Sequence, residues 1–365
     1  MVKYRFEQIA INSTEKKKPV EEDRFTYLGL EHLDSGSLKV TRFGSEVAPI
    51  GEKLVMHKGD VLFGKRRAYQ KKVAIAPFDG IFSAHGMVLR PREDVIDKSF
   101  FPLFISSDYF LDAAIKISVG SLSPTINWRD LKTLEFELPD LATQRKLAET
   151  LWSINDTMET YKKLIAATDE LVKSQFMELF GDPVTNTQGR EVRPFKDFML
   201  DIRYGTSQPP TFNELGEFKF IRATNIKAGR ITENGMLRIS ADEAAKIEKC
   251  RLNGNEIIIV RSGANTGDTC VVTDEYRDQY AGYDIIVTLN LEIANPVFFN
   301  ELMNTHYMQA IIKPLTVRAA QPHINSEQVQ NLPMLVVPLQ EQEQFATFVR
   351  QSDKSKFELE KALSE

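Results

Sequence analysis

The amino-acid sequence predicts an α+β protein in which two similar α/β domains are separated and joined by long helices. Three observations predict this architecture: an internal repeat that covers most of the chain, short strand-like runs in both copies, and a long helical stretch between them. We expect the helices to pair as an antiparallel coiled coil, giving a pseudo-two-fold dumbbell. The 365 residues, 42% of them hydrophobic, suffice for two or three domains with buried cores.

The repeat is clearest in a loop that occurs twice, 198 residues apart. The loops Ser123–Asn127 and Gln321–Asn325, which we call the PxIN loops, share their Pro, Ile and Asn. Each continues through an apolar run to a proline and then to a helical segment with an early glutamine, Gln144 or Gln342. Three further pairs of segments match in the same order: Tyr27–Leu30 with Phe220–Ala223, Gly59–Lys65 with Asn255–Arg261, and Phe101–Tyr109 with Phe299–Tyr307. Four ordered matches indicate a duplicated domain.

The duplication divides the chain into four predicted parts. A first domain, a central helix, a second domain and a distal helix are expected at residues 1–140, 141–181, 182–337 and 338–365. Within the domains, β-branched and aromatic runs bounded by Gly, Asp or Pro predict strands, for example Val73–Ala76, Glu256–Val260 and Asp284–Leu289. One helix is expected over about residues 100–117 and its counterpart over 297–312, each preceding a PxIN loop.

Between the copies, apolar side chains recur in steps of four and three, as in the a/d seam of a coiled coil. The positions expected at the helix interface are Leu147, Leu151, Ile154, Met158, Tyr161, Ile165, Val172 and Phe176. From Leu141 to Phe180 the helix would be about 60 Å long at 1.5 Å per residue. A shorter, more polar seam after the second copy contains Phe345, Val349, Leu359 and Leu363, and it is the expected partner. The alternative is that each helix lies across its own domain.

Charge and cysteine content limit the class of protein. The net charge is −5; residues 1–140 carry 21 Lys+Arg against 20 Asp+Glu, and residues 182–337 carry 16 against 19. Binding to DNA would therefore use local clusters of cations, because the chain has no overall basic footprint. Cys250 and Cys270 form no CxxC motif, which excludes a disulfide framework and the usual zinc spacings and indicates a reducing cytoplasm. No run has the length and composition of a membrane span or a secretion signal.

The densest cluster of cations follows a predicted strand in the first copy. It consists of Lys65, Arg66, Arg67, Lys71 and Lys72, with Tyr69 inside it. Such a cluster suits phosphate contacts, and an arginine can bond bidentately to guanine. The equivalent surface of the second copy would use Arg222, Thr224, Asn225, Arg261, Ser262, Asn265, Thr266, Arg318, Gln321 and His323. The alternatives are a solvated loop for the cluster and a structural turn cap for the PxIN asparagines.

The order and duplication of these segments resemble the specificity subunits of Type I restriction-modification systems. The resemblance rests on the hydrophobic strand before a basic residue, the loop Gly120–Asn127, the strand-proline-glutamine entry into the helix, and the ending Phe176–Pro183. It covers nearly the whole chain. The sequence departs from the pattern by one inserted residue before Gln144 and by its short distal helix.

This resemblance implies two target-recognition domains, each reading one half of an asymmetric, bipartite site in double-stranded DNA. The helices would fix the length of the unread gap. It implies a chain that is not an enzyme and holds no cofactor or metal. Adenine methylation and cleavage, with S-adenosylmethionine, ATP and Mg²⁺, would belong to two modification subunits and a restriction subunit docked mainly on the helices.

Two other classes of protein stay open at this stage. The first is a DNA enzyme: Asn295–Phe298 faintly resembles the Asn-Pro-Pro-Tyr motif of adenine methyltransferases, but it lacks the second proline and is interpreted as a helix start. Asp201, Glu217 and Lys219 could mimic the site of a metal-dependent nuclease, although short E-x-K strings are common. The second class is a two-headed coiled-coil scaffold that binds proteins, which the acidic net charge favours.

Overall fold

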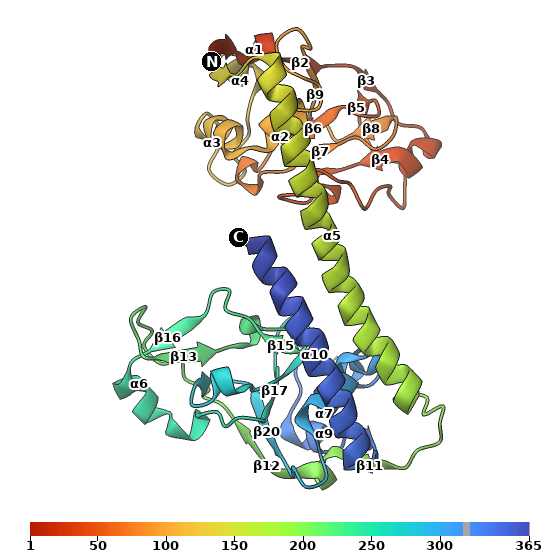
Figure 1. Cartoon of the computed structure of the whole chain (residues 1–365), viewed down its shortest axis with the longest axis vertical. Coiled ribbons are helices and arrows are strands. Elements are labelled where there is room, and N and C mark those ends of the chain that lie inside the picture. Colours follow the sequence, from red (N-terminus) through yellow and green to blue (C-terminus); the bar gives the residue numbers. More distant parts are fainter. Residues whose placement is uncertain (317–321, 365) are drawn as a thin grey trace. The chain divides into compact units, whose positions relative to one another are not determined.

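The computed structural model describes residues 1–316 and 322–364 of the chain. It divides into two compact units, Met1–Glu159 and Thr160–Glu365, which we call the N-terminal and C-terminal units. The division falls within α5 (Leu141–Phe180), a helix of 40 residues. Figure 1 shows the elements of each unit. Among the described residues, no helix combines the length and apolarity needed to cross a membrane.

The N-terminal unit is built on two four-stranded sheets and one two-stranded ladder. The first sheet has the order β2 (Ala10–Ser13), β9 (Met87–Pro91), β6 (Val61–Phe63), β7 (Val73–Ile75). The second has the order β3 (Lys16–Lys17), β5 (Lys53–Met56), β8 (Gly80–Phe82), β4 (Tyr27–Leu28). The ladder pairs β1 (Val2–Arg5) with β10 (Glu135–Leu138), so the start of the unit is hydrogen-bonded to the strand that leads into α5.

The C-terminal unit repeats the main sheet and the terminal ladder of the N-terminal unit, while its second sheet differs. Its main sheet has the order β12 (Met199–Tyr204), β20 (Ile285–Leu289), β17 (Ile257–Ile259), β18 (Thr269–Val271). A second sheet contains β16 (Leu237–Ile239), β13 (Phe218–Ile221) and β19 (Tyr280–Ala281), and two ladders pair β11 (Val192–Pro194) with β21 (Pro333–Leu335) and β14 (Ile226–Lys227) with β15 (Arg230–Ile231). Each unit has one parallel pair in its second sheet, β4 with β8 and β13 with β19. The duplication predicted from the sequence is confirmed.

Helices pack against the sheets of each unit and close its cores. In the N-terminal unit these are α1 (Phe6–Ile9), α2 (Phe101–Ser106), α3 (Asp108–Lys116) and α4 (Trp128–Leu131). The C-terminal unit has α6 (Ala241–Lys246), α7 (Pro296–Asn304), a π-helical turn (Met308–Ile312), α8 (Lys313–Thr316), α9 (Ser326–Gln330) and α10 (Leu339–Ser364). Aromatic rings fill both cores; Phe6, Phe110 and Phe136 are fully buried in the first. Phe176, Phe298 and Phe345 are equally buried in the second.

The single helix expected over residues 100–117 is wrong in one respect, because it is broken at Ser107. This residue is extended (φ −73°, ψ 149°), and its hydroxyl accepts a hydrogen bond from Phe110 N. A serine that can cap the next helix competes with continuing the previous one. In the second copy, α7 likewise ends at Asn304, and Thr305 is extended.

The early glutamine of each copy fastens a helix to its own unit. Gln144 is fully buried; its amide donates to the carbonyls of Val95 and Pro139 and accepts from Asp97 N. Gln342 forms the same three bonds with the equivalent residues, Ile293 O, Val337 O and Asn295 N. The inserted residue before Gln144 leaves this arrangement unchanged. We call these residues the glutamine latches.

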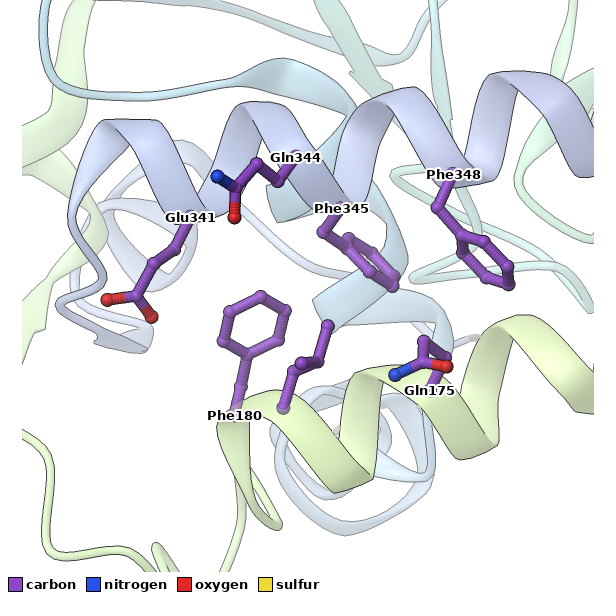
Figure 2. Close-up of a pocket in the computed structure, with 7 residues that line it drawn as sticks. Gln175, Phe180, Glu341, Gln344, Phe345 and Phe348 are labelled. Carbon is purple, nitrogen blue, oxygen red and sulfur yellow. The ribbon is translucent and has the colours of Figure 1, made fainter.

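Within the C-terminal unit, the last part of α5 packs antiparallel against α10. The ring of Phe345, near the start of α10, lies 5.5 Å from the rings of Phe176 and Phe180. Further along α10, the ammonium of the buried Lys356 lies 2.5 Å from the carboxylate of Asp169, which precedes those phenylalanines in α5. The order of contacts establishes the antiparallel direction. Figure 2 shows a cavity of about 210 Å³ at this junction, whose lining includes Gln175, Phe180, Glu341, Gln344, Phe345 and Phe348.

Candidate nucleic-acid interface

In each unit, the turn after an inner strand of the main sheet pairs with the PxIN loop. Ile126 N donates to Lys65 O at 2.9 Å, and Ile324 N donates to Arg261 O at 3.0 Å. Lys65 and Arg261 therefore occupy equivalent positions in the two units. The sequence predicted the post-strand turns and the PxIN loops as separate DNA contacts. The structure joins them into one surface per unit.

In the N-terminal unit, this surface presents two outward-facing arginines. Arg66 is exposed, and its Nε donates to Ser123 Oγ of the PxIN loop at 3.0 Å. Arg67 is exposed and has a left-handed backbone conformation (φ 53°). Tyr69 exposes 58% of its surface beside them. This arrangement places two cations and an aromatic ring where a polyanion can reach them.

The lysines of the same cluster have different surroundings. Lys71 is ion-paired with Asp108 at 2.6 Å and Asp112 at 2.9 Å, and these hydrogen-bonded carboxylates raise the pKa of Lys71. Lys65 is half-buried, and burial together with the charge of Lys16 lowers its pKa. The charge of Lys71 is thus partly satisfied within the protein, whereas Lys65 and Lys16 repel each other.

In each unit, a second turn follows a parallel strand of the second sheet, β4 or β13. One side chain ties this turn to the surface just described. Lys72 Nζ donates to Leu30 O at 2.7 Å, and Asn265 Nδ2 donates to Ala223 O at 3.2 Å. Leu30 and Ala223 occupy equivalent positions, because each lies two residues after the end of a parallel strand, β4 or β13. In both cases the carbonyl of the last strand residue accepts a backbone hydrogen bond from the loop after the parallel partner strand, β8 or β19. These bonds favour a positioning role for Lys72 and Asn265.

Two residues predicted as DNA contacts are buried. Asn225 is fully buried; it accepts from Arg222 N and donates to the carbonyls of Thr232 and Asn234, capping a 3₁₀ turn. His32 caps the equivalent turn of the N-terminal unit by accepting from Gly29 N. Thr266 is 3% exposed and donates to Gly263 O. Because a base or phosphate cannot reach these side chains, we remove Asn225 and Thr266 from the proposed contacts.

The remaining predicted positions of the C-terminal unit stay accessible. Thr224 is exposed, while Arg222, Arg261, Ser262 and His323 are half-buried. Ser262 and His323 form an isolated β-bridge, so the turn and the PxIN loop are adjacent. Arg318 and Gln321 lie outside the described residues.

The side chain of Arg261 has neighbours that local sequence does not reveal. Its guanidinium carbon lies 4.5 Å from the ring centroid of Tyr204 and 4.2 Å from that of Tyr283. Arg261 N donates to the buried carboxylate of Asp284 at 3.0 Å. Burial raises the pKa of Asp284 to about 6, although Arg261 partly offsets this effect. The two tyrosines come from the ends of neighbouring strands, so only the strand register could have identified them.

The expected helix-interface residues fall into three groups. Val172, Phe176, Phe345 and Val349 are buried in the core of the C-terminal unit. Tyr161, Ile165, Leu359 and Leu363 are half-buried. Leu147, Leu151, Ile154 and Met158 remain 38–51% exposed among the described residues. Within the C-terminal unit, α10, with 26 residues, is shorter than α5.

Two of the residues considered for an enzyme, Asn295 and Lys219, have structural roles. Asn295 caps α7 by accepting from Val297 N and Phe298 N, with Pro296 in the first turn, which confirms the interpretation as a helix start. Lys219 is ion-paired with Glu233 at 2.8 Å and Glu275 at 3.2 Å. Within residues 1–316 and 322–364, no group of His, Cys, Asp and Glu side chains is arranged to hold a metal ion.

Fold and surface together define the class of protein: a chain of two related α/β domains that present different side chains at equivalent positions. The chain belongs to the family of Type I restriction modification DNA specificity domains, whose model it matches over residues 17–168 and 191–365. The two matched segments correspond to the two copies of the repeat. The predicted resemblance is confirmed.

Two curated relatives come from Escherichia coli. The chain is 27% identical to the Type I restriction enzyme EcoDI specificity subunit over 187 residues, which are 50% of this chain and 41% of that protein. It is 21% identical to the EcoKI specificity subunit of strain K12 over 295 residues, 75% of this chain and 62% of that protein. The matches thus span less than two thirds of the length of either relative.

Two solved structures share the fold. The Type I restriction-modification system S subunit from M. genitalium aligns with all of this chain and 92% of its own, with a TM-score of 0.59 and 14% identity. A structure described as the basis of complex assembly and conformational transition of the Type I system aligns with the same shares, with a TM-score of 0.50 and 18% identity. At these identities the likeness establishes the α+β fold with two similar halves, as predicted.

Proposed function

We propose that this chain is the DNA-specificity subunit of a Type I restriction-modification complex. Residues 1–140 and 182–337 are its target-recognition domains, and residues 141–181 and 338–365 are its spacer helices. Each domain reads one half of a bipartite, asymmetric site in double-stranded DNA. The observation that carries this proposal is the composite surface of post-strand turn and PxIN loop, formed in the same way in both units but with different side chains. Different side chains on one frame support two different half-sites.

In this proposal the contacts divide into two kinds. Arg66, Arg67 and Tyr69 meet the DNA backbone in the first half-site, because exposed cations serve phosphate contacts. Arg222, Thr224, Ser262 and His323 contact the second half-site together with Arg261. Lys65 and Lys71 add positive charge to the first surface, while Lys72 and Asn265 hold the adjoining turn in place.

The chain itself carries no catalysis in this proposal. Two modification subunits supply adenine methylation with S-adenosylmethionine, and a restriction subunit supplies cleavage with ATP and Mg²⁺. The spacer helices are the proposed docking surface: the cavity in Figure 2 and the exposed stretch from Leu147 to Met158 offer apolar area to partner helices. The free thiols of Cys250 and Cys270, together with DNA as the ligand, support action in the cytoplasm.

The test is to co-express the chain with a modification subunit in a methylation-free host and to map modified adenines across the genome. The expected result is one gapped, two-part motif that disappears when this chain is omitted. No new methylation from a confirmed complex would favour a protein-binding scaffold instead. An ungapped motif would mean that one unit does not read DNA.

A further inference from the structure

The guanidinium of Arg261 is held between two aromatic rings, an arrangement that fixes the orientation of its plane. Tyr204 ends β12, and its hydroxyl accepts a hydrogen bond from Ser326 N at 2.8 Å, which ties the ring to the helix after the PxIN loop. Tyr283 lies between β19 and β20 and exposes 43% of its surface. Each ring face attracts the cation through the negative charge of its π system. The side chain is therefore oriented before any ligand arrives.

The polar atoms of Arg261 indicate which donors are left for a ligand. Its Nε is buried and has no acceptor among the described residues, and one terminal nitrogen lies 3.4 Å from His323 Nε2. The backbone N–H is used by Asp284. A ligand would therefore meet the two terminal nitrogens, which present parallel N–H groups in a rigid fork.

The N-terminal unit has no such arrangement at the equivalent position. Strand register aligns Ile285 with Met87, so Tyr283 corresponds to His85 and Tyr204 corresponds to Thr14. Lys65 replaces Arg261, and a cavity of about 160 Å³ lined by Thr14, Lys65, Asn127 and others lies here instead. A lysine offers a point charge without a planar fork, so the two units differ in recognition chemistry at one position of a shared frame.

A fixed, half-buried arginine suits a base better than a phosphate. Phosphates attract cations from many directions, and the exposed Arg66 and Arg67 are adequate for that purpose. Discrimination between bases requires donors at defined positions, and guanine presents two adjacent acceptors, O6 and N7, in the major groove. Tyr204 and Tyr283 hold the donors of Arg261 at defined positions before binding, so little further conformational entropy is lost when a base binds.

We propose that Arg261 reads a guanine in the half-site recognised by the C-terminal unit, donating from its terminal nitrogens to O6 and N7, with Tyr204 and Tyr283 as positioning residues. This inference rests on the proposed function. It assigns a base to one half-site and a specificity role to two tyrosines. It also predicts that Lys65 does not read guanine in this bidentate manner.

The first test maps methylation motifs for the full chain in complex with its modification subunit. Arg261→Gln and Arg261→Lys are expected to relax one guanine of one half-site, lowering discrimination by about 5- to 150-fold, and to leave the other half-site unchanged. Tyr283→Ala should relax the same guanine partially, whereas Tyr283→Phe, which keeps the ring, should retain it. The matched control Lys65→Gln should leave that guanine as strictly required as before.

The second test uses the wild-type complex, so that a folding defect of a variant cannot obscure the result. Each guanine of the mapped motif is replaced in turn by 7-deazaguanine, which lacks the N7 acceptor, and the dissociation constant is measured. Replacement of one guanine should weaken binding about 5- to 30-fold, and this penalty should disappear in Arg261→Ala, which has no side-chain donor for N7. The proposal is overturned if no guanine is sensitive, or if the penalty persists in that variant. If the wild-type complex produces no gapped motif, the proposed function fails first.

Discussion

At the scale of single residues, equivalent positions of the two units carry different chemistry on the same backbone. Residues that hold the turns together differ in type but not in role: Lys72 and Asn265 each reach the carbonyl of the neighbouring turn, and His32 and Asn225 each cap it. The sequence predicted which segments form the surface, because basic residues after a strand are a local signal. The sequence could not separate accessible side chains, which are free to contact DNA, from side chains that hold the turns, since this distinction depends on burial and on strand register.

Asp284 should make stability depend on pH in a defined direction. Burial raises its pKa in the folded state to about 6. A raised carboxyl pKa means that the folded state binds more protons, so this contribution to stability is fully present below about pH 4 and is lost as pH rises to about 6. Asp284→Asn keeps an acceptor for Arg261 N–H without the buried charge.

We therefore expect Asp284→Asn to raise the free energy of unfolding by about 1–3 kcal/mol at neutral pH, with a difference that shrinks towards pH 4. Urea unfolding across pH 4 to 8 measures this difference. The exposed Asp242→Asn serves as the control and should follow the wild type. A variant less stable than wild type at neutral pH would contradict the argument.

Arg67 should contribute to affinity mainly through phosphate. Arg67→Gln in the complex with the modification subunit is expected to lower the slope of log affinity against log salt by about one, because each phosphate contact releases about 0.9 counterion. It should leave the methylation motif unchanged. The exposed Lys98→Gln removes the same charge outside the surface and should leave the slope as it is. An equal change in both variants would indicate a general charge effect instead.

At the scale of elements, composition and periodicity predicted strands and the long helix, but they did not predict helix breaks or packing partners. The apolar seam predicted α5, and β-branched runs bounded by turn residues predicted β7, β17 and β20 to within a residue of their observed ends. The break at Ser107 was missed because a serine in a helical pattern is compatible with either a cap or a continuous helix. For the seam, periodicity shows that one face of α5 is apolar, but it does not show what covers that face.

The glutamine latches should be sensitive to loss of their hydrogen bonds. Gln342→Leu keeps the volume but leaves Asn295 N–H and two carbonyls without their partner in the core. We expect the free energy of unfolding to fall by about 2–4 kcal/mol, since each buried unsatisfied group costs about 1–3 kcal/mol. Thermal and urea unfolding measure this, with the exposed Gln340→Leu as the control. Equal stability of both variants would show that the latch is not structural.

At the scale of the whole molecule, the acidic net charge leads us to expect that the affinity of the chain for DNA depends on the modification subunit. With a net charge of −5, long-range attraction to DNA is weak, and the basic clusters are local. We expect affinity for the mapped site to rise at least about tenfold when the modification subunit is added, which corresponds to about 1.4 kcal/mol.

Phe348→Glu provides the matched variant, because this residue lines the cavity of Figure 2 and lies outside both proposed DNA surfaces. It should reduce the gain from the modification subunit without changing the weak affinity of the chain alone. Fluorescence anisotropy at fixed ionic strength measures both quantities. An isolated chain that binds as tightly as the complex would contradict this dependence.

The glutamine latches also affect how the two units can be exchanged between genes. Because each unit fastens its adjoining helix with its own glutamine and its own backbone acceptors, the reading surface and its attachment are encoded together in one contiguous stretch of gene. A recombination event within the helix-coding segments would then transfer a complete reader, already fitted to a helix, without disturbing the other one. Under the proposed function, exchange of one such module would change one half-site and leave the other as it was.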